Sequence, residues 1–375
     1  MGRAILATLA AAIALSGCMN GGILRAPAPT AVTTAVPTPS LAPPNDPQPL
    51  VFPRDEGPHD RLTEWWYYTG HLETDEGRRF GFEFVVFRAE RGDFPVAWAS
   101  HYAVSDPTAG FLEYDQRSEF GPQVDRSPAD GGFDLALRPA FVDAGVVVDP
   151  WTMRGGGGRD HLSAGMLSYV IDLELSTDRQ PVLHDGDGWL DLGPAGGTYY
   201  YSRTRMDVAG TLSLPRAPDE GPQHVTGMAW FDHQWGDFIA VGAGGWDWFS
   251  VQLDDGRDLT ISSVHGPGGA EVLRYGTLVS ADGSYRHLSA DEIQISVLAR
   301  WQSPRSGADY PAEWRVELPG EGLELLLAPT LADQELDTTA STGVVYWEGE
   351  VTVTGRDGEG PVGGVGYVEL TGYAK

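Results

Sequence analysis

The fold is decided by Glu64-Trp-Trp-Tyr-Tyr-Thr-Gly-His-Leu72, which is followed by the turn Asp75-Glu-Gly77 and by Arg79-Phe-Gly-Phe-Glu-Phe-Val-Val-Phe87. A β-strand turns every second side chain to the same face, and the last segment has an apolar residue at each such position: Phe80, Phe82, Phe84 and Val86. The first segment is rich in the aromatic residues that strands favour. Together they predict two antiparallel strands joined by a short turn.

Short segments of the same kind recur from residue 51 onward, separated by turn residues. No long stretch has the 3.6-residue apolar period of an amphipathic helix. The 49 glycines and 27 prolines fit a fold with many turns. The sequence therefore predicts an all-β protein built as antiparallel sandwiches or barrels.

A polar, turn-rich stretch at residues 215–222 divides the chain into a first domain, residues 51–214, and a second, residues 223–375. A weak internal repeat supports two similar halves. Trp65–Glu73 can be laid on Trp246–Asp254, each followed by an acidic-Gly-Arg turn, and Tyr346–Val353 is a fainter third copy. The alternative is that any hairpin can place an aromatic strand before Asp-Gly.

The N-terminal segment has the pattern of an export signal. Arg3 precedes an apolar run from Ala4 to Leu15, which ends in Leu15-Ser-Gly-Cys18. This tetrapeptide resembles the lipobox of bacterial lipoproteins, whose cysteine becomes the lipidated N-terminus. Residues 1–18 are therefore predicted to be a signal peptide, and Cys18 a lipid anchor that holds the exported protein on the bacterial cell envelope, at the cell membrane or the outer membrane. The alternative is an ordinary signal peptide with an incidental cysteine.

Residues 19–50 are rich in proline, alanine and threonine. Such a composition cannot bury enough apolar surface to fold, so the segment is predicted to be a disordered, semi-extended tether.

The composition excludes several classes of partner. A formal net charge of −28 argues against nucleic acid and against docking on anionic lipid through a basic patch. Hydrophobic residues make up 41% and aromatic residues 10% of the chain, which is the composition of a folded protein. The single cysteine excludes an intrachain disulfide and a thiolate zinc site. A monomer that binds a small molecule is expected.

The candidate site is centred on Met228-Ala-Trp-Phe-Asp-His-Gln-Trp-Gly236 and on Gly245-Trp-Asp-Trp-Phe249. Aromatic walls with a few ionisable groups suit a ligand cavity, although the same residues could fill a core. In a strand His233 and Trp235 share one face and Asp232 lies on the other. His233 is the leading acid or base, and Asp232 is a possible acid whose pKa burial would raise.

Ligand-binding residues are expected among the aromatic side chains of both segments and of the first strand: Trp65, Trp66, Tyr67, Trp230, Trp235, Trp246 and Trp248. Glu64 is included as a second acid at the rim of a pocket, although a glutamate before a strand is more often solvated.

Other chemistries lack their motifs. The histidines show no H-x-H or H-E-x-x-H spacing, so no metal is expected. There is no G-x-S-x-G nucleophile motif, and no G-K-S/T follows the glycine run at Gly155–Gly158. No cofactor is predicted.

A further set of motifs covers nearly everything from residue 52 onward: Phe52–Leu72, Arg78–Arg88, Tyr199–Arg205, Ala229–Gly236, Gly245–Arg257, Ser303–Pro311, Asp333–Leu336, Tyr346–Gly349 and Gly366–Tyr373. Together these segments resemble the carotenoid 1,2-hydratase and AttH group, lipocalin-like proteins that include predicted secreted hydrolases. The resemblance implies two lipocalin-like β-barrel domains with an apolar calyx. It also implies addition of water to a double bond without a cofactor, with His233 and Trp235 at the site.

The sequence departs from the hydratase pattern at one place. The hydratases carry a Y-x-D motif after the D-H-x-W segment, and here Trp246-Asp-Trp248 stands nearest to that position. Asp247 is therefore the candidate third catalytic residue.

Two functions remain open. One is binding of an apolar or amphipathic ligand, such as an isoprenoid or a lipid, by a tethered lipocalin-like protein. The other is a cofactor-free hydratase or hydrolase of such a ligand that acts through His233. An ionisable group beside His233 would favour the enzyme, because acid–base catalysis needs a proton source.

Overall fold

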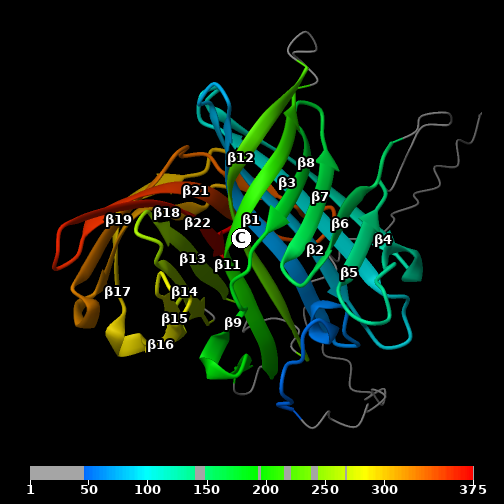
Figure 1. Ribbon diagram of the computed structural model, residues 1–375, viewed down its shortest axis with the longest axis horizontal. Coiled ribbons are helices and arrows are strands. Elements are labelled where there is room, and N and C mark those ends of the chain that lie inside the picture. Colours follow the sequence, from blue (N-terminus) through cyan, green and yellow to red (C-terminus); the bar gives the residue numbers. More distant parts are fainter. Residues whose placement is uncertain are drawn as a thin grey trace, which may run out of the picture.

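The computed structural model describes residues 46–139, 148–192, 196–214, 221–237, 244–266 and 268–374. These residues form two antiparallel β-sheets that lie side by side, and they contain no α-helix (Figure 1). The predicted all-β class is confirmed. The predicted signal peptide, Cys18 and residues 19–45 of the tether lie outside the described residues. None of the helices described is long and apolar enough to cross a membrane.

The first sheet curls into a nearly closed barrel with the strand order β4-β3-β2-β1-β12-β11-β8-β7-β6-β5, while β9 and β10 pair with β11. Its strands are β1 (Thr63–Thr74), β2 (Arg79–Ala89), β3 (Ala97–Asp106), β4 (Phe111–Phe120), β5 (Phe133–Leu137), β6 (Trp151–Gly156), β7 (Arg159–Gly165), β8 (Val170–Ser176), β9 (Val182–Leu183), β10 (Trp189–Asp191), β11 (Gly197–Ser213) and β12 (Pro222–Gly236). The predicted hairpin is β1–β2, with Trp66 paired to Val86.

The second sheet forms a half-barrel with the order β16-β15-β14-β13-β22-β21-β19-β18-β17, and β20 pairs with β21. Its strands are β13 (Gly245–Leu253), β14 (Asp258–His265), β15 (Glu271–Val279), β16 (Tyr285–Ser289), β17 (Gln294–Gln302), β18 (Asp309–Leu318), β19 (Leu323–Pro329), β20 (Glu335–Asp337), β21 (Val345–Arg356) and β22 (Pro361–Thr371). Short 3-10 helices join the strands of both sheets: η1 (Arg54–Glu56), η2 (Pro122–Val124), η3 (His184–Gly186), η6 (Ala290–Glu292) and η7 (Pro319–Glu321).

The two sheets share a strand arrangement. In each, the first four strands pair in sequence order and the last strand pairs with the first, as β12 with β1 and β22 with β13. The aligned segment Trp65–Glu73 lies in β1, and Trp246–Asp254 lies in β13 except for its last residue; the two strands hold the same place in their sheets. The fainter third copy lies in β21, the partner of the last strand, so it is not a third equivalent unit.

The passage between the sheets lies further along the chain than predicted. Residues 223–236 were assigned to the second domain, but they belong to β12, which pairs with both β1 and β11 of the first sheet. The chain reaches the second sheet only after Gly236. The prediction failed because proline, glycine and acidic residues mark a hairpin turn as readily as a domain boundary.

Strands β1, β2 and β12 bury both of their faces. One face carries the predicted row Phe80, Phe82, Phe84 and Val86 into the interior of the first barrel. The opposite face packs against the second sheet, where Tyr67 and Trp230 meet Trp248 and Tyr367. Burial on both faces explains why these strands read as nearly continuous apolar runs rather than as alternating ones.

Candidate functional site

His233 lies inside the first barrel. It pairs with Trp66 of β1 and with Tyr201 of β11, and its side chain is fully buried. Its ring stacks on Trp66 with 4.6 Å between the ring centres. The Nε2 atom lies 2.9 Å from Oε1 of Glu64, and Nδ1 lies 3.3 Å from the hydroxyl of Tyr201. The predicted face of β12 is correct, since Phe231, His233 and Trp235 all point into this interior.

Glu64 joins His233 to a second histidine, His59. The Nδ1 atom of His59 lies 2.7 Å from the same Oε1 atom, and its backbone N–H donates to Oε2 of Glu64 at 2.9 Å. The ring of His59 lies parallel to that of Trp235, with centres 4.0 Å apart. Its side chain is 19% exposed, whereas Glu64 and His233 are completely enclosed. The expectation of a solvated Glu64 is therefore wrong.

The pKa values of the two histidines shift in opposite directions. Burial disfavours the ionised form of Glu64, but the charge of His59 and hydrogen bonds from both rings lower its pKa to about 2. Burial alone would lower the pKa of His59, yet Glu64 and Asp55 together raise it above its usual value. For His233 burial prevails, and its pKa falls. The surroundings therefore favour the charged form of the His59 ring and the neutral form of the His233 ring.

The tautomer of His233 follows from this arrangement. An ionised carboxylate can only accept hydrogen bonds, so the Nε2 atom of His233 carries the proton. Its Nδ1 atom then accepts from the hydroxyl of Tyr201. At the other end, the Nε2 atom of His59 lies 3.7 Å from the carboxylate of Asp55. A line of polar groups thus runs from the partly exposed His59 to the buried Tyr201.

The barrel interior is not the apolar calyx that the resemblance implies. Aromatic side chains fill much of it, and polar pairs lie among them. Arg203 pairs with Glu56, and the hydroxyl of Tyr68 donates to Asp160 at 2.8 Å. Burial raises the pKa of Asp160 to about 6. The interior therefore combines aromatic walls with ionisable groups.

The remaining aromatic candidates lie between the two sheets, on the side of the first sheet away from His233. Tyr67, Trp230 and Trp248 are buried where the two sheets meet, and Trp65 and Trp246 are partly exposed beside them. Asp232 belongs to this second group, which lies between the sheets. It accepts hydrogen bonds from Tyr200 at 2.5 Å and from the indole of Trp230 at 2.7 Å, and also from Ser202. Burial raises the pKa of Asp232 to about 6.

Asp247 belongs to neither group. Its carboxylate accepts from the hydroxyl of Tyr373 at 2.9 Å and lies 3.2 Å from His265. The structure therefore does not bring Asp247 to His233. Its proposed role came from its position after the D-H-x-W segment, which does not determine where a side chain on the second sheet points.

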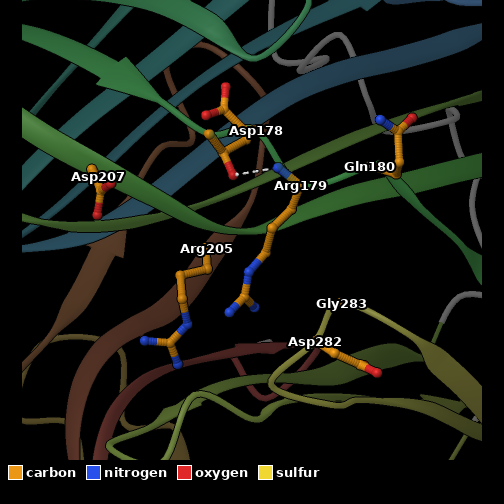
Figure 2. A pocket seen from close by; sticks show the side chains of 8 residues that line it. Asp178, Arg179, Gln180, Arg205, Asp207, Asp282 and Gly283 are labelled. Carbon is orange, nitrogen blue, oxygen red and sulfur yellow. Dashed lines mark hydrogen bonds between the residues drawn. The ribbon is translucent and has the colours of Figure 1, made fainter.

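Two of the hollows on the described surface bear on the site. The larger, of about 580 Å³, lies between the sheets and is lined by Thr177, Asp178, Arg179, Gln180, Arg205, Asp207, Asp282 and Gly283 (Figure 2). Arg179 and Arg205 both bind the buried Asp258. The smaller hollow, of about 470 Å³, is lined mostly by polar residues of the first sheet. Neither is lined by the His59–Glu64–His233 cluster or by the predicted aromatic residues.

Among the described residues, one group could hold a metal ion. One ligand atom from each of His59, Glu64 and His233 lies within 4.8 Å of the others. Both ring nitrogens already bond the same carboxylate oxygen, so hydrogen bonding accounts for their convergence. The expectation that no metal binds remains a prediction.

Sequence reasoning missed His59 and Tyr201. His59 lies five residues before Glu64, in the turns that precede β1, where no strand or helix period predicts a direction for its side chain. Tyr201 could have been found only through the pairing of β11 with β12.

The fold and the buried polar cluster define the class of this protein: a two-sheet, lipocalin-like β-protein with ionisable groups inside its first barrel. A profile of the AttH-like family matches residues 43–373. The chain therefore belongs to the AttH-like family.

Solved structures agree with this family. A putative AttH from Nitrosomonas europaea is 33% identical, with a TM-score of 0.76, covering 89% of this chain and 100% of its own. Kievitone hydratase from Nectria haematococca is 17% identical, with a TM-score of 0.65, covering 87% of this chain and 94% of its own. CghA with Sch210972 is 10% identical, with a TM-score of 0.54, covering 84% of this chain and 89% of its own. No curated protein matches significantly.

Proposed function

We propose that this protein is a cofactor-free acid–base catalyst of the hydratase type, acting on an apolar or amphipathic ligand such as an isoprenoid. The observation that carries the proposal is the single carboxylate, Glu64, shared by a partly exposed His59, whose pKa is raised, and a buried His233, whose pKa is lowered. Glu64 is the ionisable partner beside His233 that acid–base catalysis requires, and its presence supports the enzyme over the binding protein. A neighbour named as a hydratase has the same fold, which makes hydration the first chemistry to test.

The proposed reaction begins at the Nε2 edge of His59. Its Nδ1–H is held by Glu64, so the Nε2–H is the proton that can leave toward a carbon–carbon double bond. The second carbon of the double bond then becomes a cation. Water adds to this carbon through its oxygen, and its surplus proton returns to Nε2 of His59. The net change is the addition of one water molecule.

The surroundings of His59 suit these steps. The indole of Trp235 lies parallel to the His59 ring, and an aromatic face beside the reacting carbon would stabilise positive charge there. Asp55, 3.7 Å from the Nε2 atom, can orient the attacking water. Glu64 stabilises the charged ring. On its buried side Glu64 is hydrogen-bonded by His233, which is hydrogen-bonded in turn to Tyr201. His233 acts in this scheme as a positioning residue.

The second candidate is ligand binding without turnover. Trp65 and Trp246 favour it, because they present partly exposed aromatic surface between the sheets, away from any proton donor of the cluster. Both proposals include export of the protein and its anchoring through a lipid on Cys18.

The test is made in two steps with the full chain. Native mass spectrometry after exposure to a lipid and isoprenoid extract identifies retained ligands. Each is then incubated with the protein in heavy-oxygen water, with and without a chelator. The proposal expects one heavy oxygen atom in the product and no effect of the chelator. A ligand that is bound and recovered unchanged would establish the binding function instead.

A further inference from the structure

One end of the first barrel exposes two phenylalanines. Phe94 lies in the connection between β2 and β3 with 78% of its surface exposed, and Phe120 ends β4 with 56% exposed. Two exposed aromatic side chains at one end of the barrel would suit contact with an apolar surface.

Strand register puts both residues at the same end. Thr63 of β1 pairs with Ala89 of β2, Ala89 with Ala97 of β3, and Ala97 with Phe120 of β4. These four residues form a row across the sheet. Phe94 lies in the loop that connects Ala89 to Ala97. We call the end of the barrel marked by this row the tether end.

The described chain also begins at the tether end. The carboxylate of Asp46 pairs with Arg61 at 2.8 Å and accepts from the hydroxyl of Tyr199 at 2.7 Å. Arg61 lies two residues before Thr63, the start of the row. In Figure 1 this blue segment lies at the lower edge of the first barrel. The residues that lead back to the predicted lipid anchor at Cys18 therefore join the folded part at the same end as Phe94 and Phe120.

The opposite end provides the comparison. Phe111 begins β4 and is 40% exposed, and Leu167, between β7 and β8, is 66% exposed. The ring of Phe111 packs against Tyr169, which follows Leu167, so these two residues mark the far end of the barrel. Exposure alone does not separate the two ends. The two ends differ in one respect, which is that the described chain begins at the tether end.

We infer that the tether end rests on a lipid bilayer, with Phe94 and Phe120 inserted among the headgroups. Aromatic side chains favour this interfacial layer. The partner is a zwitterionic lipid surface, because a net charge of −28 would be repelled by an anionic one. His59 lies four residues before Thr63, the start of the same row. This orientation would therefore place the proposed site near the bilayer, in which an apolar ligand dissolves. The inference uses the predicted anchor but does not require catalysis.

The experiment measures the depth of each end in a bilayer. The full chain, exported and processed in a bacterial host, carries one new cysteine labelled with an environment-sensitive dye: Phe94→Cys or Phe120→Cys at the tether end, and Phe111→Cys or Leu167→Cys at the far end. Peptide mapping verifies that only the new cysteine is labelled. Each protein is reconstituted into phosphatidylcholine vesicles with spin-labelled lipid, and circular dichroism confirms its fold.

The inference predicts that the dye at 94 and 120 shifts its emission to the blue and is quenched about twofold or more, because interfacial side chains lie within ~5–10 Å of the acyl boundary. The dye at 111 and 167 should be unchanged. Equal quenching at both ends, or none at 94 and 120, would overturn the inference. A shift at 94 that needs added envelope proteins would overturn it too, in favour of a protein partner.

Discussion

At the scale of single residues, the central feature is one carboxylate that hydrogen-bonds two histidines in different surroundings. Glu64 bonds both rings through the same oxygen, yet only His59 reaches the surface. The surroundings favour the charged form of the partly exposed ring and the neutral form of the enclosed ring, because burial penalises the charged form more where no water remains. A charged ring at the surface is what a proton donor requires.

The first prediction concerns the pH dependence of turnover. His59 must be protonated to act as the acid, and its pKa lies above the usual value for histidine. Turnover should therefore be constant at low pH and fall tenfold per pH unit above that pKa. The measurement is a pH–rate profile on the ligand found by mass spectrometry. A profile that rises with pH through the same range would assign the reaction to a base instead.

The second prediction concerns stability. The pKa of Glu64 is 4.5 in an unfolded chain and about 2 in the folded protein, so the folded state gains stability above pH 4.5 and loses it as the pH falls toward 2. Glu64→Gln removes this gain. Urea unfolding should show an advantage of the wild type over Glu64→Gln that shrinks by about 2 kcal/mol between about pH 6 and pH 3.

The control for that change is Glu73→Gln. Glu73 is half exposed and pairs with an exposed Arg79, so its substitution should alter the free energy of unfolding by less than about 1 kcal/mol. An equal pH dependence in both variants would show that the effect does not come from the buried cluster.

At the scale of strands and turns, the alternation of side chains along a strand was a better predictor of the structure than the positions of the turn residues. The alternation in β2 correctly assigned Phe80, Phe82, Phe84 and Val86 to one face. The alternation in β12 correctly separated His233 from Asp232. Both assignments rest on the two-residue period of side chains, which every β-strand has. The domain boundary and His59 were missed because both depend on irregular segments, where no period relates sequence to direction.

The third prediction tests the packing of β12 on β1. A Cβ atom at Gly227 would lie 1.9 Å from the carbonyl oxygen of His71 on the paired strand. Gly227→Ala should therefore lower the free energy of unfolding by about 2 kcal/mol or more. Gly358→Ala, in the turn between β21 and β22, meets nothing within 4 Å and should change it little. Equal effects in urea unfolding would refute the tight register of β1 and β12.

At the scale of the whole molecule, the two sheets are joined by buried carboxyl groups as well as by aromatic residues. Glu83 of β2 accepts from the hydroxyl of Tyr346 at 3.0 Å, and Glu348 of β21 accepts from Tyr67 at 2.8 Å. The second oxygen of each has no partner among the described residues. Burial raises the pKa of Glu83 to about 8, and burial with the neighbouring carboxyls raises that of Glu348. The contact between the sheets therefore favours the neutral form of both acids.

The fourth prediction follows from this contact. The unfolded chain ionises Glu83 near pH 4.5, but the folded protein keeps its proton until about pH 8, so stability declines as the pH rises through this range. Glu83→Gln cannot ionise. It should raise the thermal midpoint by a few degrees at about pH 9 and change it little at about pH 5. The same shift at both values would mean that the carboxyl of Glu83 is not protonated in the folded state.

The most direct test of the account is the turnover of His59→Gln beside that of His224→Gln, a histidine that is 55% exposed and bound only to an exposed aspartate. Both are compared with the wild type on the same ligand in heavy-oxygen water. The account predicts that His59→Gln lowers incorporation of heavy oxygen by about a hundredfold or more while ligand binding persists, and that His224→Gln has no effect. Full turnover in His59→Gln would contradict it.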